Sequence, residues 1–295
     1  MPRLPIPDDL LACGRRVLFF FAHQDDELPY GGLIQRAPAG SRFLWLTNGD
    51  GIADELKMEP AEYAAARQLE TMAALRTVGV ERDRLTLLGH SEKVIYRQFL
   101  AVASRPHEAL PFFLRLSAQV TAEFQAARPD VVFTLAWQGG HPEHDLVHLL
   151  ARAACATLPG TRLFELPEYE LANLVPLRFP PWHLGPVYEL KLTPEEMAGK
   201  QRMRNCYPTQ ARILRQFTCL IRTVGLLGIV TAGRPLGIKE YLGVETFGPV
   251  PEKREYTASP HGLDSLDYVG DDCDGVPISY VRMIAPIARA LVENA

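Results

Sequence analysis

The sequence predicts an α/β fold in which helices flank a doubly wound, mainly parallel sheet, with a less regular C-terminal part. Short apolar runs such as 17–22 (VLFFFA) recur over the first 170 residues, and longer stretches with helical spacing separate them. After about residue 167 this alternation weakens. Wholly apolar runs are typical of strands buried on both faces, and strands that alternate with helices are typical of right-handed βαβ units.

Five segments in the first part are predicted to be strands. If they are numbered along the chain, a doubly wound sheet in the order 3-2-1-4-5 makes the first and fourth strands neighbours. Ligands bind outside the carboxyl ends of the strands at such a switch point. The predicted strands are residues 17–22, 42–47, 85–88, 130–137 and 162–166.

Helices are predicted between these strands. The strongest is 60–78, where Tyr63, Leu69 and Met72 are among apolar residues close to helical spacing. The run Asn48–Gly51 (NGDG) predicts a loop. The other predicted helices of the first part are 27–35, 109–127 and 145–157.

The C-terminal part is less regular. We expect residues 1–170 to form the core, and residues 171–295 to complete that core and its pocket rather than to fold as an independent domain. Segment 175–186 is rich in proline, and 250–277 is rich in Pro, Gly, Asp and Ser, which predicts a loop. The segments 194–203, 209–224 and 278–292 are predicted to be helices and 187–192 a strand.

The composition is that of an ordinary globular protein. Of 295 residues, 47% are hydrophobic and 22% charged, and the net charge is −4. A chain of this charge favours a small-molecule partner over a nucleic acid, which selects a basic surface. The five cysteines are scattered and odd in number, which argues against a disulfide scaffold. Together with an N-terminus that lacks the order of a signal peptide, they predict a cytoplasmic protein.

The longest apolar run of the C-terminal half, residues 223–233, is too short to span a bilayer. We therefore predict no membrane span. A buried or interface segment is the favoured interpretation of this run, and a patch that touches a membrane is the alternative.

Two groups of polar residues follow the first and fourth predicted strands. Residues 22–27 (AHQDDE) and 139–144 (GGHPEH) both stand where a strand ends and a helix begins. If the two strands are neighbours, both groups lie at one edge of the sheet. Each motif alone also fits an ordinary helix start, with acidic residues favoured in the first turn or with solvated histidines. Their pairing at two strand ends favours a metal site.

The residue types fit a catalytic zinc ion, which takes three ligands from His and carboxylate and keeps one position for water. His23 and Asp26 are three residues apart and can share one face of a turn, and His144 supplies a third ligand. Asp25 is then free to act as general base on a zinc-activated water. His141 can stabilise the oxyanion or protonate the leaving amine.

The two motifs resemble those of the PIG-L/LmbE family of N-acetylglucosaminyl deacetylases, which share an AHPDDE first motif and an HPDH-like second motif. The resemblance covers residues 15–170 well and thins afterwards, although residues 200–210 (KQRMRNCYPTQ) resemble a family segment. It implies a Rossmann-like fold, a divalent metal that is usually zinc, and hydrolysis of an N-acetyl or related amide on a glucosamine-type sugar.

The same resemblance implies the roles of five residues. His23, Asp26 and His144 match the metal ligands, Asp25 the general base, and His141 the oxyanion-stabilising or acid histidine. Two residues depart from the family pattern, because Gln24 replaces a proline and Glu143 an aspartate. Glu143 can alter the contacts that support a histidine ligand, whereas metal binding itself is not affected.

Arg67 and Glu70 lie three residues apart on the predicted helix 60–78, so they share one face. They are either a surface ion pair or, as the resemblance implies for Arg67, a contact to the sugar. Asn48, Asp50 and the turn 90–92 also follow strand ends, where ordinary loop residues are the favoured interpretation. His148, four residues after His144, is the best replacement ligand.

The sequence thus predicts a zinc-dependent hydrolase that removes an N-acetyl group from an N-acetylglucosamine-type sugar or conjugate. One alternative is an amidase that acts on a larger acyl group of a thiol or antibiotic conjugate. Another is a non-catalytic sugar- or nucleotide-binding protein, which lacks the support of a GxGxxG loop. Other divalent metals also suit an N2O site. A homo-oligomer is compatible with the sequence.

Overall fold

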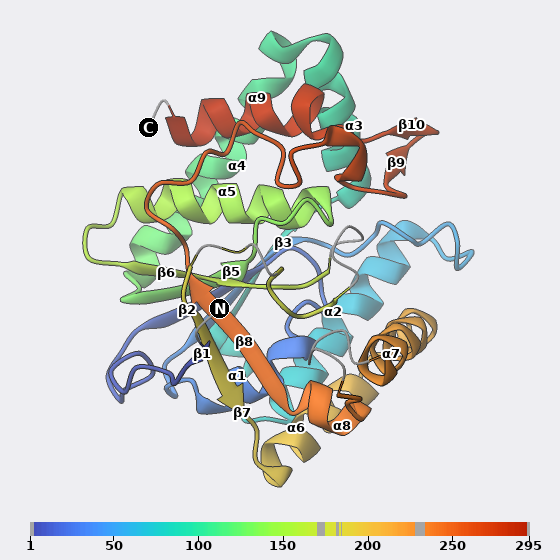
Figure 1. Ribbon diagram of the computed structural model, residues 1–295. Helices are drawn as coiled ribbons and strands as arrows, with labels where there is room; N and C mark the ends of the chain where they lie inside the picture. The colour runs from blue at the N-terminus through green and yellow to red at the C-terminus, as the bar shows by residue number, and fades with distance from the viewer. Residues whose placement is uncertain (1–2, 170–174, 181–182, 184, 228–233, 294–295) are drawn as a thin grey trace.

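A computed structural model of the chain describes residues 3–169, 175–180, 183, 185–227 and 234–293. Its centre is an eight-stranded sheet in the order β1-β7-β8-β6-β5-β2-β3-β4 (Figure 1). All neighbouring pairs are parallel except β6–β8 and β7–β8, which are antiparallel. The strands are β1 (Arg3–Leu4), β2 (Val17–Phe21), β3 (Arg42–Thr47), β4 (Leu85–His90), β5 (Val131–Leu135), β6 (Arg162–Leu166), β7 (Val187–Lys191) and β8 (Val244–Pro249).

The five strands predicted for the first part are β2 to β6, and their predicted order is confirmed, because β6-β5-β2-β3-β4 are successive neighbours. Every residue of β2 and of β5 is buried, as expected for strands covered on both faces. Phe19 of β2 stacks on Phe43 of β3 and on Phe133 of β5, with ring centroids 5.0 and 5.1 Å apart. The switch point of the sheet lies where β2 meets β5.

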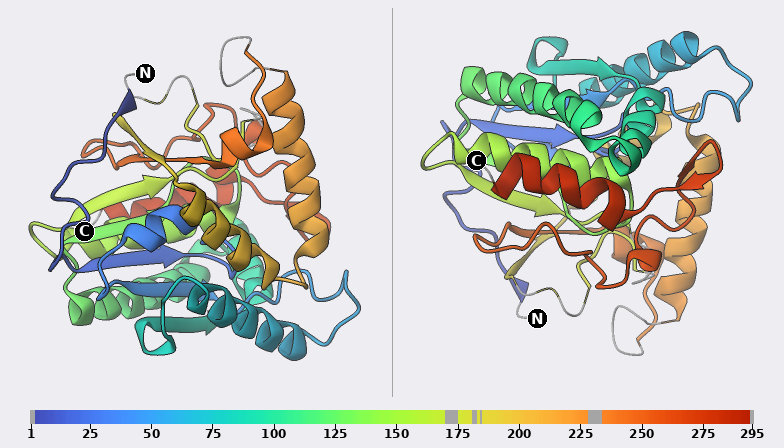
Figure 2. Two further views of the ribbon diagram at one scale, coloured as in Figure 1. Left: turned by 90° about the horizontal axis from the view of Figure 1, so that it is seen from below. Right: turned by 90° about the horizontal axis from the view of Figure 1, so that it is seen from above.

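Helices cover both faces of the sheet, so the predicted α/β class is confirmed. In the two views of Figure 2, the helices α1, α2 and α6 lie on one face, and α3, α4, α5 and α9 on the other. The helices are α1 (Gly31–Arg36), α2 (Pro60–Arg76), α3 (Glu92–Ser104), α4 (Pro106–Ala127), α5 (Pro142–Ala156), α6 (Pro194–Asn205), α7 (Ala211–Leu226), α8 (Ile238–Leu242) and α9 (Ala285–Ala288).

Two differences from the predicted elements affect the site. Helix α5 begins at Pro142 rather than at residue 145, because proline fits the first helical position and the His141 side chain accepts from the N–H of Glu143. Helix α3 was not predicted at all. The Ser91 side chain caps its N-terminus by accepting from the N–H of Val94.

The segment after residue 170 extends the same sheet. Strand β7 was predicted, but β8 was not, and β8 connects β6 to β7. Part of segment 250–277, predicted to be a loop, forms a small hairpin of β9 (Asp272–Cys273) and β10 (Val276–Pro277). The predicted closing helix spans Tyr280–Glu293, and within it α9 lies between two π-helical turns.

The apolar run 223–233 lies only partly within the described residues, since 228–233 fall outside them. In the part that is described, Val224 is buried, whereas Leu226 and Leu227 are 62% and 67% exposed. None of the helices in the described ranges has the length and hydropathy needed to cross a bilayer.

Candidate metal centre and reaction pocket

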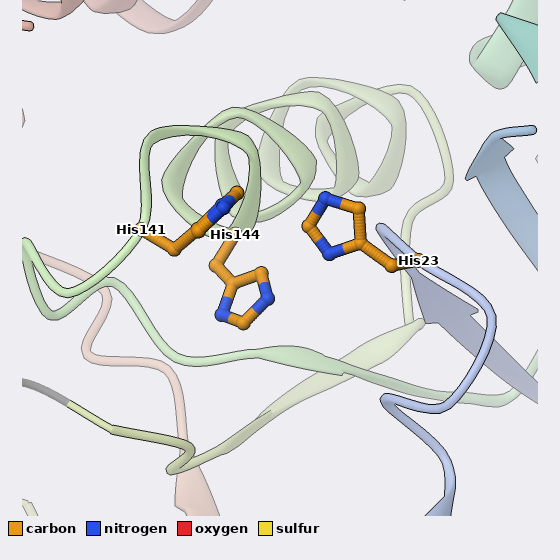
Figure 3. Close-up of side chains that lie close together, drawn as sticks. All are labelled: His23, His141 and His144. Carbon is orange, nitrogen blue, oxygen red and sulfur yellow. The ribbon is translucent and has the colours of Figure 1, made fainter. Parts of the chain in front are cut away.

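The two predicted motifs meet at the carboxyl edge of the sheet, because β2 and β5 are paired neighbours. The loop after β2 supplies His23, while His141 and His144 come from the start of α5. In Figure 3 the three rings face a common space from these two elements. Ring centroids lie 4.8 Å apart for His23 and His141, 5.2 Å for His23 and His144, and 4.8 Å for His141 and His144.

A buried carboxylate orients the His23 ring. Nε2 of His23 lies 2.7 Å from Oε2 of Glu143, whose side chain is fully buried. The other ring nitrogen, Nδ1, lies on the side of Asp26, 3.6 Å from Oδ2. A carboxylate that holds one nitrogen of a histidine while the other faces inward is the usual support of a metal-binding histidine. Glu143, the residue that departs from the family pattern, therefore fills a supporting position.

The two oxygens of Asp26 have different surroundings. Oδ2 accepts hydrogen bonds from the backbone N–H groups of Ala22 and His23, at 3.0 and 2.7 Å. Oδ1 faces His144 and lies 3.3 Å from its Nε2. Burial alone raises the pKa of Asp26, but the neighbouring histidines His144 and His23 hold this pKa well below its usual range. The carboxylate is thus kept charged and has one oxygen directed into the cluster.

The two histidines of α5 differ in their hydrogen bonds. Nδ1 of His141 accepts from the N–H of Glu143 at 3.3 Å, and its Nε2 lies 3.3 Å from the hydroxyl of Tyr96. Nε2 of His144 is buried and forms no well-aligned hydrogen bond among the described residues, although Oδ1 of Asp26 lies 3.3 Å away. A buried nitrogen that lies beside a carboxylate oxygen without a well-aligned hydrogen bond to it is compatible with a cation bound by both groups.

The donor set fits a divalent cation. The imidazole nitrogens of His23 and His144 together with a carboxylate oxygen of Asp26 are the ligand types that catalytic zinc takes. Among the described residues, two sets of side chains bring one ligand atom each within 4.8 Å of one another, and neither set includes Asp26. These are His23 with His141 and His144, and His23 with Glu92 and Glu143. Because both nitrogens of His141 already have neighbours, the set with Asp26 leaves fewer groups unpaired.

Asp25 has a strained backbone, with φ of 117°. A non-glycine residue in this region costs about 1–3 kcal/mol, and such strain concentrates at functional sites. Its Oδ1 accepts from Nη2 of Arg67 at 2.9 Å. Burial raises the pKa of Asp25 to about 6, against the opposing positive charge of Arg67. The carboxylate is therefore a base whose pKa lies close to neutral pH.

Arg67 and Glu70 do share a face of α2, but the interpretation as a surface ion pair is wrong. Their exposed fractions are only 5% and 7%. Arg67 donates to the backbone carbonyl of Gln24 as well as to Asp25. Glu70 instead accepts from the backbone N–H and the hydroxyl of Thr209, at 2.8 and 2.5 Å. Arg67 thus holds the strained turn of the first motif.

The charged groups border a pocket of about 220 Å³, which we call the reaction pocket. The sequence did not single out several of its lining side chains, which come from the segment after β6 and from the region of α7. Tyr96, which contacts His141, also lies 3.4 Å from Oδ1 of Asp271. Glu92, from the turn 90–92 noted in the sequence, lines the pocket, and the unpredicted lining residues include Glu168, Tyr169, Gln210, Ile213 and Phe217.

Other predicted candidates lie outside this pocket. His148 contacts the carbonyl of Leu135 and the hydroxyl of Tyr256, at 2.9 and 3.0 Å, so the structure does not favour it as a replacement ligand. Asp50 accepts from the Ser91 hydroxyl and from the N–H of Glu92, at 2.6 and 2.8 Å. Asp50 therefore supports the start of α3, as expected for a loop residue.

Comparison with known proteins confirms the resemblance inferred from the two motifs. The family model of PIG-L, described as GlcNAc-PI de-N-acetylase, matches residues 18–155, a range that contains both motifs. No curated protein matches the chain.

Solved structures confirm the fold. A deacetylase of the teicoplanin biosynthesis pathway, in complex with bog, has a TM-score of 0.58 and 18% identity over 79% of this chain and 97% of that chain. The deacetylase of the A40926 pseudoaglycone has a TM-score of 0.58 and 17% identity over 82% and 99% of the two chains. A zinc-inhibited form of teicoplanin deacetylase has a TM-score of 0.51 and 16% identity over 79% and 97%.

Proposed function

Because residues 18–155 match the PIG-L family model, we propose that this protein is a metal-dependent hydrolase that removes an acyl group from the nitrogen of an amino sugar. The observation that carries this proposal is the convergence of His23, Asp26 and His144 beside the partly buried base Asp25. The similar teicoplanin and A40926 proteins are deacetylases. Because they are only 17–18% identical to this chain, their structural similarity supports the fold alone, and the activity of this chain is inferred from its own residues.

In this proposal His23 Nδ1, Asp26 Oδ1 and His144 Nε2 hold the metal, and zinc is the favoured ion because of its preference for this ligand set. When bound, the metal polarises the substrate carbonyl and lowers the pKa of water. Glu143 fixes the His23 ring through Nε2, and the backbone N–H groups of Ala22 and His23 fix the Asp26 carboxylate.

Asp25 is the proposed general base. It takes a proton from the water that attacks the carbonyl carbon, and the hydroxyl becomes part of the released carboxylic acid. The amide C–N bond then breaks, and the nitrogen must gain a proton. Asp25, which now carries the proton from water, can hand it to this nitrogen, because a group with a pKa near neutrality works in both directions.

In its neutral form, His141 is expected to carry its proton on Nε2, from which it can donate a hydrogen bond to the oxyanion. Its Nδ1 accepts from the N–H of Glu143, so in the neutral ring the proton resides on Nε2. Burial is the main cause that holds the pKa of His141 well below its usual range, and protonation of the neighbouring His23 or His144 would lower it further. Of the two roles predicted from the sequence, this favours stabilisation of the carbonyl oxygen over proton donation to the amine.

Metal removal tests the proposed function directly. We expect the purified protein to release acetate from N-acetylglucosamine or its glycosides, to lose this activity after chelation, and to regain it when one equivalent of zinc or another divalent ion is restored. The measurements are acetate release and metal content by elemental analysis. A protein that binds no metal and hydrolyses no N-acyl amino sugar with any divalent ion would instead be a binding protein.

The rate should also depend on pH through Asp25. The base must be deprotonated, so activity falls as the pH drops through the pKa of Asp25, which lies at about 6. A bound cation lowers this value further. Replacement of Arg67 by Gln removes a positive charge that lowers the pKa, so the acidic limb of the kcat/KM profile should move to higher pH. A limb that stays in place or moves to lower pH contradicts the assignment of Asp25.

A further inference from the structure

A second cavity adjoins the reaction pocket. It has a volume of about 90 Å³ and lies between α6 and α7, and we call it the α6–α7 cavity. Its lining is mostly apolar, with Leu177, Met197 and Ile221 among its residues. The two cavities share four lining residues, which are Leu28, Pro29, Leu214 and Phe217. The apolar space therefore begins where the reaction pocket ends.

The polar side chains around this cavity are already hydrogen-bonded within the protein. Nζ of Lys200 donates to Oε1 of Glu245 at 2.9 Å and to the carbonyl of Pro29 at 2.5 Å. Nη2 of Arg204 donates to the hydroxyl of Thr218 at 2.9 Å. That hydroxyl donates in turn to a backbone carbonyl within α7. A ligand in the cavity thus finds apolar walls and polar groups that already have partners.

The position of the cavity selects which part of a substrate can enter it. Leu28 follows Asp26 by two residues, so the shared wall stands beside the proposed metal ligands. In an N-acyl amino sugar, the alkyl chain starts at the carbonyl carbon, which reacts at the metal. An apolar aglycone is separated from that carbon by the sugar ring. A cavity that begins beside the metal ligands therefore matches the acyl chain.

We propose that the α6–α7 cavity receives the alkyl chain of an N-acyl group longer than acetyl, which makes short- to medium-chain N-acyl amino sugars the preferred substrates. This rests on the proposed function, and it concerns the same reaction pocket. A cavity of 150 Å³ accepts benzene, so about 90 Å³ has room for roughly four carbons. Each methylene buried there should raise kcat/KM about fourfold until the cavity is full.

The test is a series of glucosamines that carry acetyl, butanoyl, hexanoyl and decanoyl groups, with kcat/KM measured for each on the zinc-loaded enzyme. We expect a rise from acetyl to hexanoyl. Met197→Trp, which fills the cavity from α6, should reduce the ratio of hexanoyl to acetyl kcat/KM at least tenfold, and Met197→Phe should have an intermediate effect. Gln216→Trp on the exposed side of α7 is the matched control and should leave the ratio unchanged.

Two results overturn the proposal while the proposed function stands. One is hydrolysis that does not increase with chain length, and the other is an increase that both Met197 variants leave intact. Hydrolysis of an octyl glycoside of N-acetylglucosamine by the wild type and by Met197→Trp tests whether the cavity holds the aglycone instead. If Met197→Trp selectively slows hydrolysis of this glycoside and leaves the acyl series unaffected, the cavity holds the aglycone and the proposal is wrong.

A binding measurement separates this proposal from the proposed function. Calorimetry with hexanoate and acetate, the acids that such substrates release, requires no turnover. We expect hexanoate to bind more tightly than acetate, and Met197→Trp to abolish this difference. If no N-acyl glucosamine is hydrolysed, the proposed function fails. In that case the calorimetry still tests whether the α6–α7 cavity binds an alkyl chain. Equal affinity for hexanoate and acetate overturns the proposal.

Discussion

Replacement of Asp25 by Asn is expected to lower kcat for N-acyl amino sugar hydrolysis by about a hundred- to ten-thousand-fold, the usual contribution of a general base. The amide retains an oxygen for Arg67, which lies 2.9 Å from the carboxylate in the native protein, so the turn should keep its shape. Asn cannot take the proton of the attacking water at neutral pH. Steady-state kinetics and elemental analysis should show lost turnover with unchanged metal content.

Asp54→Asn is the matched control. The Asp54 side chain is 78% exposed and pairs with Lys93 on the surface, so its replacement should change neither kcat nor metal content. Exposed pairs of this kind contribute little to stability. An Asp25→Asn protein that retains most of the wild-type kcat would mean that another group activates the water.

His144→Ala should release the metal. Loss of a group that only supports a metal ligand costs about 10–100-fold in affinity. We expect loss of the ligand itself to cost more than about 100-fold, with turnover lost in parallel. The observation behind this expectation is the buried Nε2 of His144, which lies 3.3 Å from Oδ1 of Asp26 without a well-aligned hydrogen bond to it. Competition with a chromophoric chelator measures the dissociation constant.

His141→Ala separates the two histidines of α5. If the ligand set contains Asp26, this variant should bind metal almost as wild type does while its kcat falls. Equal loss of metal in His141→Ala and His144→Ala would instead favour the three-histidine set. His107→Ala serves as the control, because the His107 side chain is 80% exposed and lies outside the reaction pocket.

The site residues that could be predicted are those that come directly after the end of a buried strand. The end of a buried strand fixes where the next residues lie, so the positions of His23, Asp26 and His144 followed from two apolar runs and the switch-point rule. Side chains that reach the site from α3 and α7 were missed because tertiary packing decides which of them face the pocket. For α3, however, a signal was present, since Ser91 precedes apolar residues at helical spacing.

Strand β8 was missed for a physical reason of a different kind. Its residues Glu245 and Thr246 are buried, although such residues usually mark a solvated face. Glu245 accepts from the backbone N–H groups of Gly32 and Leu33 and pairs with Lys200. A strand whose buried positions carry satisfied polar groups lacks the apolar run by which β2 and β5 were recognised.

The contact between Glu27 and Tyr207 bears on the order in which this protein matures during synthesis. The Tyr207 hydroxyl donates to the Glu27 carboxylate, and the two residues are separated by 180 positions. Burial raises the pKa of Glu27 to about 7, while the bond from Tyr207 lowers it. A nascent chain that has emerged only through β6 holds both metal motifs but lacks this partner for a carboxylate beside the base. Because Glu27 accepts from the backbone N–H of Asp25, the chain must emerge through Tyr207 before the strained turn at Asp25 gains this support.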